Sequence, residues 1–154
     1  MGAYYFDSSA LVKRYADETG SLWVRSLTAP QAGHVIFTAH ITGIEVVAAI
    51  ARKVRMGEIA EHEATTAIST FKSHFKTQYQ IVVLTTEIVD RAMELAEQYR
   101  LRGYDAAQLA SALVVHAELA ASGVSEFVFT SADTDLNAVA RVERLSVQNP
   151  NDHP

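Results

Sequence analysis

The sequence contains no cysteine among its 154 residues. This absence excludes a disulfide framework and a thiolate metal site, and it fits the reducing conditions of a cytosol. Long hydrophobic runs are also lacking, because runs such as Val46–Ala51 are far too short to cross a bilayer. The first residues do not follow the basic-then-apolar layout of a signal peptide, since Asp7, Lys13 and Arg14 interrupt it. We therefore expect a cytoplasmic protein without a membrane partner.

Positive charge is in short supply, with 13 lysine and arginine residues against 18 aspartate and glutamate residues and a net charge of −5. Such a chain does not attract nucleic acid through its overall charge, so a nucleic-acid role would need a local basic patch or a bound cation. Internal repeats, low-complexity tracts and linkers are absent as well. We expect a single domain over residues 1–148 and a flexible C-terminal tail over residues 149–154.

The opening stretch places an acid between a strand and a helix. Residues Ala3–Phe6 are apolar and rich in aromatics, which indicates a short buried strand, and Asp7 follows directly. Ser8 and Ser9 are good starters for a helix that we expect to run to Asp17. In open α/β sheets ligands bind beyond the carboxyl ends of the strands, so Asp7 points to the place where chemistry would occur. The alternative is that Asp7 only caps the following helix.

Strands and helices alternate along the rest of the chain. Apolar runs predict strands at residues 34–38, 79–84, 126–130 and 145–147. The spacing of apolar residues and the capping signals predict helices at residues 21–28, 40–55, 58–78, 85–100, 106–121 and 134–142. The strands are continuous apolar runs, as expected where both faces of a strand are buried. The pattern predicts an α/β fold with a mainly parallel sheet of four to five strands and helices on both faces.

Four acids occupy positions from which they can reach a common crevice. Asp7 and Asp133 lie just beyond predicted strands, Asp105 opens a predicted helix, and Glu45 lies on a mostly apolar helix face. The carboxyl ends of parallel strands line one crevice, and helix entries can line it too. Each acid also has a simpler explanation. The three aspartates can serve only as helix N-caps, and Glu45 can simply reach solvent.

Carboxylates gathered in one crevice repel one another, by roughly 4 kcal/mol per pair at about 4 Å and an effective dielectric constant of about 20. Such a cluster needs a cation or shared protons. Oxygen ligands without cysteine or regularly spaced histidine suit Mg²⁺ or Mn²⁺ rather than Zn²⁺. Carboxylate-held Mg²⁺ commonly serves phosphodiester cleavage, where it activates water and neutralises developing charge. The acids therefore indicate metal-dependent hydrolysis of a phosphodiester.

Four motifs carry a resemblance to a known family. They run Phe6–Lys13, Ile41–Ala49, Leu101–Ala112 and Phe129–Leu136, and each contains one of the four acids. Together they resemble the motifs of PIN-domain ribonucleases and, within these, of VapC-type toxins of toxin–antitoxin pairs. Each motif alone is weak, but four in this order extend the resemblance over nearly the whole chain. The Leu101–Ala112 motif is the most specific match.

The resemblance implies a PIN fold, with a twisted parallel sheet and a helical hairpin that turns at Met56 and Gly57. It implies an endonuclease that cuts single-stranded or structured RNA with Mg²⁺ or Mn²⁺. It also implies a homodimer, and inhibition by a cognate antitoxin whose C-terminal segment lies across the active site.

The acids of the motifs are the expected catalytic and metal-binding residues. Asp7, Asp105 and Asp133 would hold the metal directly or through water. Glu45 would lie beside them as a further ligand, or would orient or deprotonate the attacking water. Asp135 is an alternative to Asp133 or its helper.

The family's second motif often carries a serine or threonine shortly before its glutamate, and Thr38 and Thr42 both qualify. Ser8, Ser9 and Ser131 can hydrogen-bond a carboxylate or a phosphate oxygen, or they can be plain helix caps. The basic residues that can form a rim for phosphates are Lys13, Arg14, Arg52, Lys53, Arg55, Arg100 and Arg102. These charges can equally be a solvated face or partners of helix ends. The six histidines show no ligand spacing and are expected to be structural or surface residues.

Other functions fit the sequence less well. A PIN-like scaffold or RNA-binding module with weak catalysis is the main alternative, and the presence of all four acids speaks against it. A response-regulator receiver would need an acid pair near the first strand and a lysine after the last, but Phe6 precedes Asp7 and no lysine follows Arg144. A phosphatase of the haloacid dehalogenase type would need Asp-x-Asp after the first strand, where Ser8 and Ser9 follow Asp7 instead.

Overall fold

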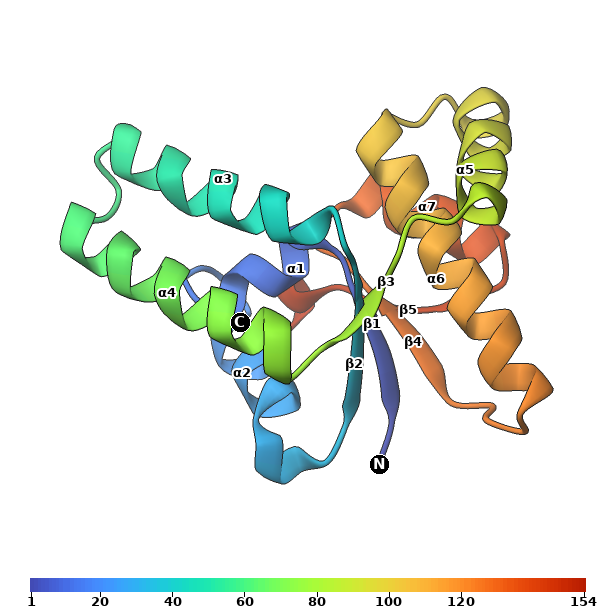
Figure 1. The fold of residues 1–154 in the computed structure, drawn as a ribbon, viewed down its shortest axis with the longest axis horizontal. Coiled ribbons are helices and arrows are strands. Elements are labelled where there is room, and N and C mark those ends of the chain that lie inside the picture. The colour runs from blue at the N-terminus through green and yellow to red at the C-terminus, as the bar shows by residue number, and fades with distance from the viewer.

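The computed structural model describes residues 1–154, and a sheet of five short strands forms its centre (Figure 1). The strands are β1 (Ala3–Phe6), β2 (Val35–Ala39), β3 (Gln80–Val82), β4 (Phe127–Thr130) and β5 (Ser146–Gln148). They pair in the order β3-β2-β1-β4-β5, and every pair is parallel. The α/β fold with a parallel sheet, expected from the sequence, is confirmed.

The strand order changes direction at β1. The chain extends through β2 and β3 to one side of β1, and through β4 and β5 to the other side. In an open α/β sheet the crevice at such a switch point is the usual ligand site. Asp7 follows β1 and Asp133 lies beyond β4, so these two acids flank the switch point.

Helices cover both faces of the sheet (Figure 1). One face carries α1 (Ser8–Leu11), α2 (Ser21–Thr28), α3 (Thr42–Arg55) and α4 (Glu61–Thr77), with the short 3-10 helices η1 (Val12–Arg14) and η2 (Pro30–Ala32). The other face carries α5 (Thr86–Tyr99), α6 (Gly103–Ala121) and α7 (Thr134–Val142). Helices α3 and α4 form the expected hairpin, which projects away from the sheet (Figure 1).

Neighbouring residues of β1 enter two different cores, because successive side chains of a strand point to opposite faces. Tyr5 packs in a core with Leu109 of α6 and Leu136 of α7. Phe6 packs in a second core with Val46 of α3 and Phe71 of α4. Each such side chain contributes about 1.5–3 kcal/mol when fully buried. Strand β1 is therefore packed on both faces, and this packing holds its carboxyl end in place.

Two helix boundaries near the acids differ from the prediction. The first helix was expected to reach Asp17, but α1 ends at Leu11 and the chain tightens into η1. The helix expected from residue 106 begins at Gly103, because the N–H of Ala106 already donates to the carbonyl of Arg102 (2.9 Å). The segment that was expected to break the chain is thus the first turn of α6.

The last residues differ from the loose tail expected from their polar composition. Asn149 and Pro150 are buried, and a further 3-10 helix, η3, spans Pro150–Asp152. The ring of His153 stacks on Trp23 of α2 with centroids 4.2 Å apart. A tertiary partner for these residues exists only after folding, which is why composition alone did not reveal the packing.

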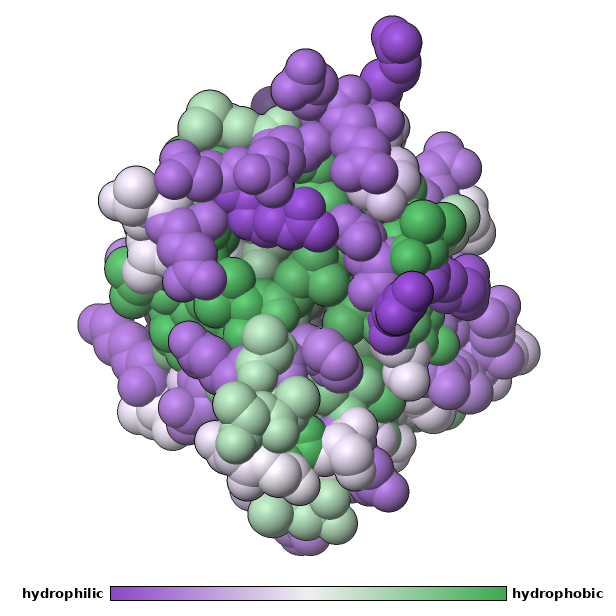
Figure 2. All heavy atoms as spheres, turned by 90° about the vertical axis from the view of Figure 1, so that its right-hand side faces the viewer, coloured by the Kyte–Doolittle hydropathy of each residue, from purple (hydrophilic) through white to green (hydrophobic).

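The face that carries α5 and α6 shows hydrophobic residues gathered across its middle, with hydrophilic residues around them (Figure 2). Exposed apolar side chains of α5 and the connection before it are Val83, Leu84, Val89 and Met93. None of the helices combines the length and the hydrophobicity that a membrane-spanning segment requires.

Candidate active site

Asp7 lies at the carboxyl end of β1, where its N–H donates to the carbonyl of Thr130 at the end of β4 (3.1 Å). Its Oδ1 accepts hydrogen bonds from Ser9 Oγ (2.7 Å) and the Ala10 N–H (3.0 Å), and its Oδ2 accepts one from Ser131 Oγ (2.5 Å). The bond from Ala10 makes Asp7 the N-cap of α1, as one of the two interpretations expected. The bonds from the two serines go further, because they fix the carboxylate at the junction of β1 and β4.

The Asp7 carboxylate is buried without a positive partner. Asp7 is 4% exposed, and this burial raises the pKa of its carboxyl to about 6. The negative charge of Glu45 raises the pKa as well, whereas the hydrogen bonds from Ser131, Ser9 and the Ala10 N–H lower it. Burying an ionised carboxylate costs free energy unless a positive charge compensates for it. The environment of Asp7 therefore favours the binding of a cation or a proton.

Glu45 lies in the first turn of α3 and is half-buried. Ser8 Oγ donates to its Oε2 (3.1 Å), and Gln108 Nε2 donates to its Oε1 (2.8 Å). These bonds direct Glu45 towards α1 and α6, so it does not simply reach solvent. Of the two candidate threonines, Thr42 lies beside Glu45 and accepts a hydrogen bond from Gln108, whereas Thr38 Oγ1 donates to a backbone carbonyl of β1.

Asp105 is the third residue of α6, which begins at Gly103. The interpretation of Asp105 as an N-cap is therefore wrong, since Arg102 occupies that position. Partial burial raises the pKa of the Asp105 carboxyl, and the charges of Asp133 and Glu45 raise it further. Arg102 lowers the pKa of Asp105. Asp105 has no capping task and lies within the electrostatic reach of two other acids of the set.

Asp133 is the N-cap of α7. Its Oδ1 accepts hydrogen bonds from the N–H groups of Asp135 and Leu136, both at 3.0 Å. Its own N–H donates to Ser131 Oγ (3.1 Å), and the same hydroxyl donates to Asp7 Oδ2. Asp133 therefore does cap α7, and its negative charge also raises the pKa of the Asp105 carboxyl. Asp135 is exposed in the first turn of α7.

The four acids form a series of neighbouring charges rather than a closed cage. Asp7 is influenced by Glu45, and Asp105 is influenced by both Glu45 and Asp133. None of the four forms an ion pair with lysine or arginine. As placed, no three of them lie close enough together to form a ready-made metal site. The oxygen-only donors and the uncompensated charge fit a hard dication, which would draw the carboxylates together.

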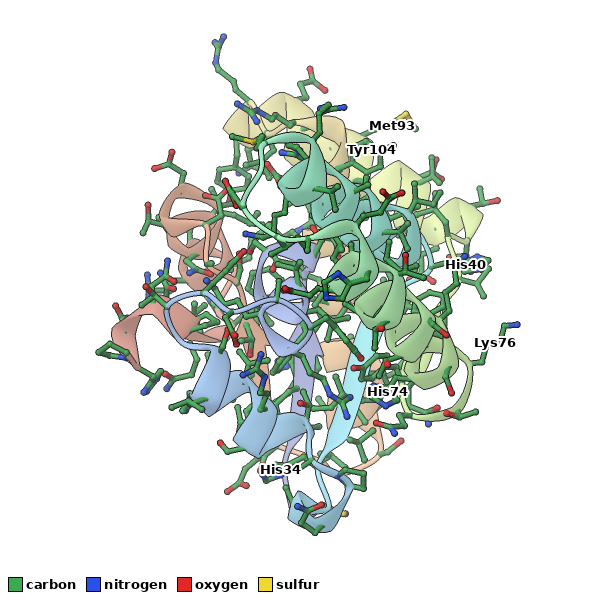
Figure 3. All side chains as sticks on the ribbon, turned by 90° about the vertical axis from the view of Figure 1, so that its left-hand side faces the viewer. His34, His40, His74, Lys76, Met93 and Tyr104 are labelled. Atoms are coloured by element: carbon green, nitrogen blue, oxygen red, sulfur yellow. The ribbon has the colours of Figure 1, made fainter.

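The histidines do not contribute a metal cluster. His34 precedes β2, His40 follows it and His74 lies in α4 (Figure 3). His34 Nδ1 accepts a hydrogen bond from the N–H of Gly2 (2.9 Å), and His74 Nδ1 bonds the hydroxyl of Tyr15 (2.9 Å). These contacts agree with the structural role expected from their spacing.

The basic residues expected at the rim have different surroundings. Lys13 is 4% exposed and its ammonium pairs with Glu18 (3.0 Å). Arg14 donates to the hydroxyl of Tyr79 (2.6 Å), so both residues are engaged within the protein. Lys53 also pairs with Glu18, while Arg52, Arg55 and Arg100 are exposed. Arg102 is exposed beside Asp105 and is the basic residue that acts on an acid of the set.

Two residues near the acids were not predicted from the sequence. Gln108 bonds Glu45 directly, and the hydroxyl of Tyr5 donates to Gln108 Oε1 (2.6 Å). A signal for Gln108 was available, because it is the only long polar side chain in the run Ala106–Leu113. Tyr5 gave no signal, since an aromatic residue in a buried strand is ordinary.

The fold and the acids at its switch point define a family, and a sequence model of the PIN domain matches residues 4–142. The chain belongs to the PIN-domain family. Within the family it is 35% identical over 115 residues to ribonuclease VapC45 of Mycobacterium tuberculosis (strain CDC 1551 / Oshkosh) and to ribonuclease VapC49 of Mycobacterium tuberculosis (strain ATCC 25618 / H37Rv). Each match covers 75% of this chain and 78% of the relative. The resemblance to VapC-type PIN domains is confirmed.

Solved structures agree on the fold. PAE2754 from Pyrobaculum aerophilum matches with a TM-score of 0.63 and 18% identity, over 98% of this chain and 85% of that one. VapBC2 from Rickettsia felis, bound to a DNA fragment from its promoter, matches with a TM-score of 0.62 and 12% identity, over 96% and 98%. A toxin–antitoxin complex from Klebsiella pneumoniae matches with a TM-score of 0.57 and 20% identity, over 96% and 97%.

Proposed function

We propose that this chain is an endoribonuclease toxin of the VapC type that depends on Mg²⁺ or Mn²⁺. The observation that carries the proposal is the set of four neighbouring carboxylates at the switch point, none of which is neutralised by a lysine or arginine. The relatives at 35% identity are named as ribonucleases, which supports RNA as the substrate class.

In this proposal Asp7, Asp105 and Asp133 hold the metal, with Glu45 beside them. The bound metal would supply an activated water and neutralise the charge that develops on the phosphate. The three donors to Asp7 orient its carboxylate before any metal arrives, which reduces the reorganisation that binding requires.

Glu45 is suited to hold or accept a proton from the attacking water. Its carboxylate is held from two sides, by Ser8 Oγ at one oxygen and Gln108 Nε2 at the other. General bases act only within hydrogen-bond reach of the proton that they accept, so a fixed orientation matters for this role. Arg102 is the candidate for a phosphate contact, because it is exposed beside Asp105.

The proposal is tested by incubating the purified protein with total RNA, with and without Mn²⁺, and mapping the ends of the products. Cleavage that requires Mn²⁺ and disappears in Asp105→Asn supports the proposal. The matched control is Asp90→Asn, an identical charge change on an exposed residue of α5, which should cleave like the wild type. RNA binding without cleavage would instead identify the chain as a binding module.

A cognate antitoxin is proposed as the partner that inhibits the nuclease, with its C-terminal segment across the acids. The Klebsiella pneumoniae structure, described as a toxin–antitoxin complex and matched over 96% of this chain, supports a partner of this kind. Co-expression with the protein encoded by the adjacent gene should yield a complex and suppress cleavage. A chain that purifies alone after this co-expression and still cuts RNA would contradict this part of the proposal.

A homodimer is proposed as the form of the free protein. The exposed side chains Val83, Leu84, Val89 and Met93 support it, because apolar groups gathered on one face favour association. Light scattering after size exclusion should give twice the mass of 16.8 kDa. A monomer mass at micromolar concentrations would contradict the proposal.

A further inference from the structure

Gln108 is a buried amide that connects three segments carrying acids of the site. It is 2% exposed, although it lies one turn into α6, only three residues after Asp105. Its Nε2 donates to Glu45 Oε1 (2.8 Å) and to Thr42 Oγ1 (2.9 Å), both in the first turn of α3. Its Oε1 accepts from the hydroxyl of Tyr5 in β1 (2.6 Å), two residues before Asp7.

Hydrogen-bond chemistry fixes the orientation of this amide. A carboxylate can only accept, so the NH₂ group of Gln108 must face Glu45 and its oxygen must face Tyr5. Burial raises the pKa of the Tyr5 hydroxyl well above its ordinary value, so the phenol keeps the proton that it donates. Both amide hydrogens and the amide oxygen have partners, so the side chain has no alternative arrangement of equal quality.

A purely structural role does not explain these residues well. Position 108 lies in a run of small and apolar residues, and a leucine or methionine would fill similar space without needing three polar partners. Likewise, phenylalanine at position 5 would preserve the stacking of Tyr5 on Phe129 without a hydroxyl to satisfy. A single hydrogen bond in such a network adds modest net stability, whereas a buried polar group that loses its partner is costly. What this network does produce is a carboxylate in a single orientation.

We propose that Gln108 is a positioning residue that sets the orientation of the Glu45 carboxylate for the metal and the attacking water, with Tyr5 as its anchor. This inference rests on the proposed nuclease function. It adds that the second and third motifs are joined to β1, the strand before Asp7, by a direct chain of hydrogen bonds from β1 through α6 to α3. Outer partners of metal-binding side chains typically change metal affinity or activity by about 10–100-fold when removed.

The test compares the wild type with Gln108→Met, a variant whose side chain has a similar length and volume but cannot donate a hydrogen bond. Mn²⁺ binding is measured by calorimetry without RNA, and kcat and KM are measured on a short RNA that the wild type cuts. We expect Mn²⁺ affinity and kcat to fall by about tenfold or more, while KM changes by less than about threefold. Tyr5→Phe keeps the amide but removes its anchor, and should lower both values by a smaller factor.

A double-mutant cycle separates positioning from general damage to the fold. If Gln108 acts through Glu45, adding Gln108→Met to Glu45→Gln should not lower Mn²⁺ affinity further by more than about twofold. The control is Thr28→Val, which removes a buried hydroxyl bonded to a backbone carbonyl of α2. This variant should bind Mn²⁺ and cut RNA like the wild type, although it also loses a buried hydrogen bond.

The outcomes distinguish a failure of the positioning role of Gln108 from a failure of the nuclease proposal. A wild type that cuts RNA, with a folded Gln108→Met that binds Mn²⁺ and turns over equally well, overturns the inference and leaves the nuclease proposal intact. Equal losses in Gln108→Met and Thr28→Val, or full additivity with Glu45→Gln, also overturn it. A wild type that neither binds Mn²⁺ nor cuts RNA overturns the nuclease proposal and the inference with it.

Discussion

Replacing Asp7 by asparagine should remove a destabilisation of the metal-free protein that grows as the pH rises, while it abolishes RNA cleavage. The carboxyl is 4% exposed, and burial raises its pKa to about 6 from an ordinary value of 3.8. The folded protein therefore binds this proton more tightly than the unfolded chain does. Ionisation of Asp7 then destabilises the fold as the pH rises from about 4 to above 6, and the stability present at lower pH is lost. Asparagine cannot ionise and escapes this loss.

The size of the effect follows from the pKa. At about 1.4 kcal/mol for each pK unit, the ionised carboxylate costs the metal-free protein about 3 kcal/mol at neutral pH. About 2 kcal/mol of this cost appears between pH 4.5 and pH 7.5. The substitution also disturbs the bonds from Ser9, Ser131 and Ala10, each worth about 1 kcal/mol. That disturbance is present at both pH values, so the change between them isolates the ionisation.

The assay is urea unfolding in EDTA at pH 4.5 and pH 7.5, for the wild type and Asp7→Asn. The advantage of the variant in unfolding free energy should grow by about 2 kcal/mol at the higher pH. Asp90→Asn, the same change on an exposed residue of α5, should show a much smaller difference between the two pH values. If wild type and Asp7→Asn respond to pH in parallel, the Asp7 carboxylate is not strained by burial and the reasoning fails.

Four further predictions concern the metal and other residues. Mn²⁺ at about a hundred times its dissociation constant should raise the unfolding free energy of the wild type by about 2.7 kcal/mol, and a similar gain in Asp7→Asn would contradict the assigned ligands. Glu18→Gln should cost about 2 kcal/mol in urea unfolding, because it leaves the ammonium of Lys13 buried without its partner, which is 3.0 Å away. By the same contact, Lys13→Met should retain RNA cleavage, and a large rise in KM would show that Lys13 leaves its pair to reach RNA. Gly20→Ala should destabilise the protein by about 2 kcal/mol or more and expose the C-terminal residues to proteolysis. The reason is that φ is +85° at Gly20 and a Cβ there would lie 2.1 Å from the carbonyl oxygen of Pro150. A variant whose C-terminal residues resist proteolysis as well as those of the wild type would contradict this packing.

Local patterns were sufficient for the elements and for the acids. Ala3–Phe6 is a strand because its apolar residues are buried on both faces, and that requirement is visible as a continuous run. The helix Ser21–Thr28 and the helix Thr134–Val142 were predicted at their observed bounds. Asp7 and Asp133 stood out for the same local reason, because an acid after an apolar run both ends a strand and caps a helix.

Contacts between distant segments decided the rest, because no periodicity or capping signal encodes them. The pairing of β1 with both β2 and β4 brings Ser131 onto Asp7 across 124 positions of the sequence. Packing of α6 against the sheet places Gln108 between Tyr5 and Glu45. The 3-10 helix after α1 turns Lys13 inward, where it pairs with Glu18 instead of facing solvent. The sequence alone specified which side chains carry charge and which segments are strands or helices. Only the folded chain determined which of those charges are buried, paired or left to repel one another, since burial and distance are properties of tertiary packing.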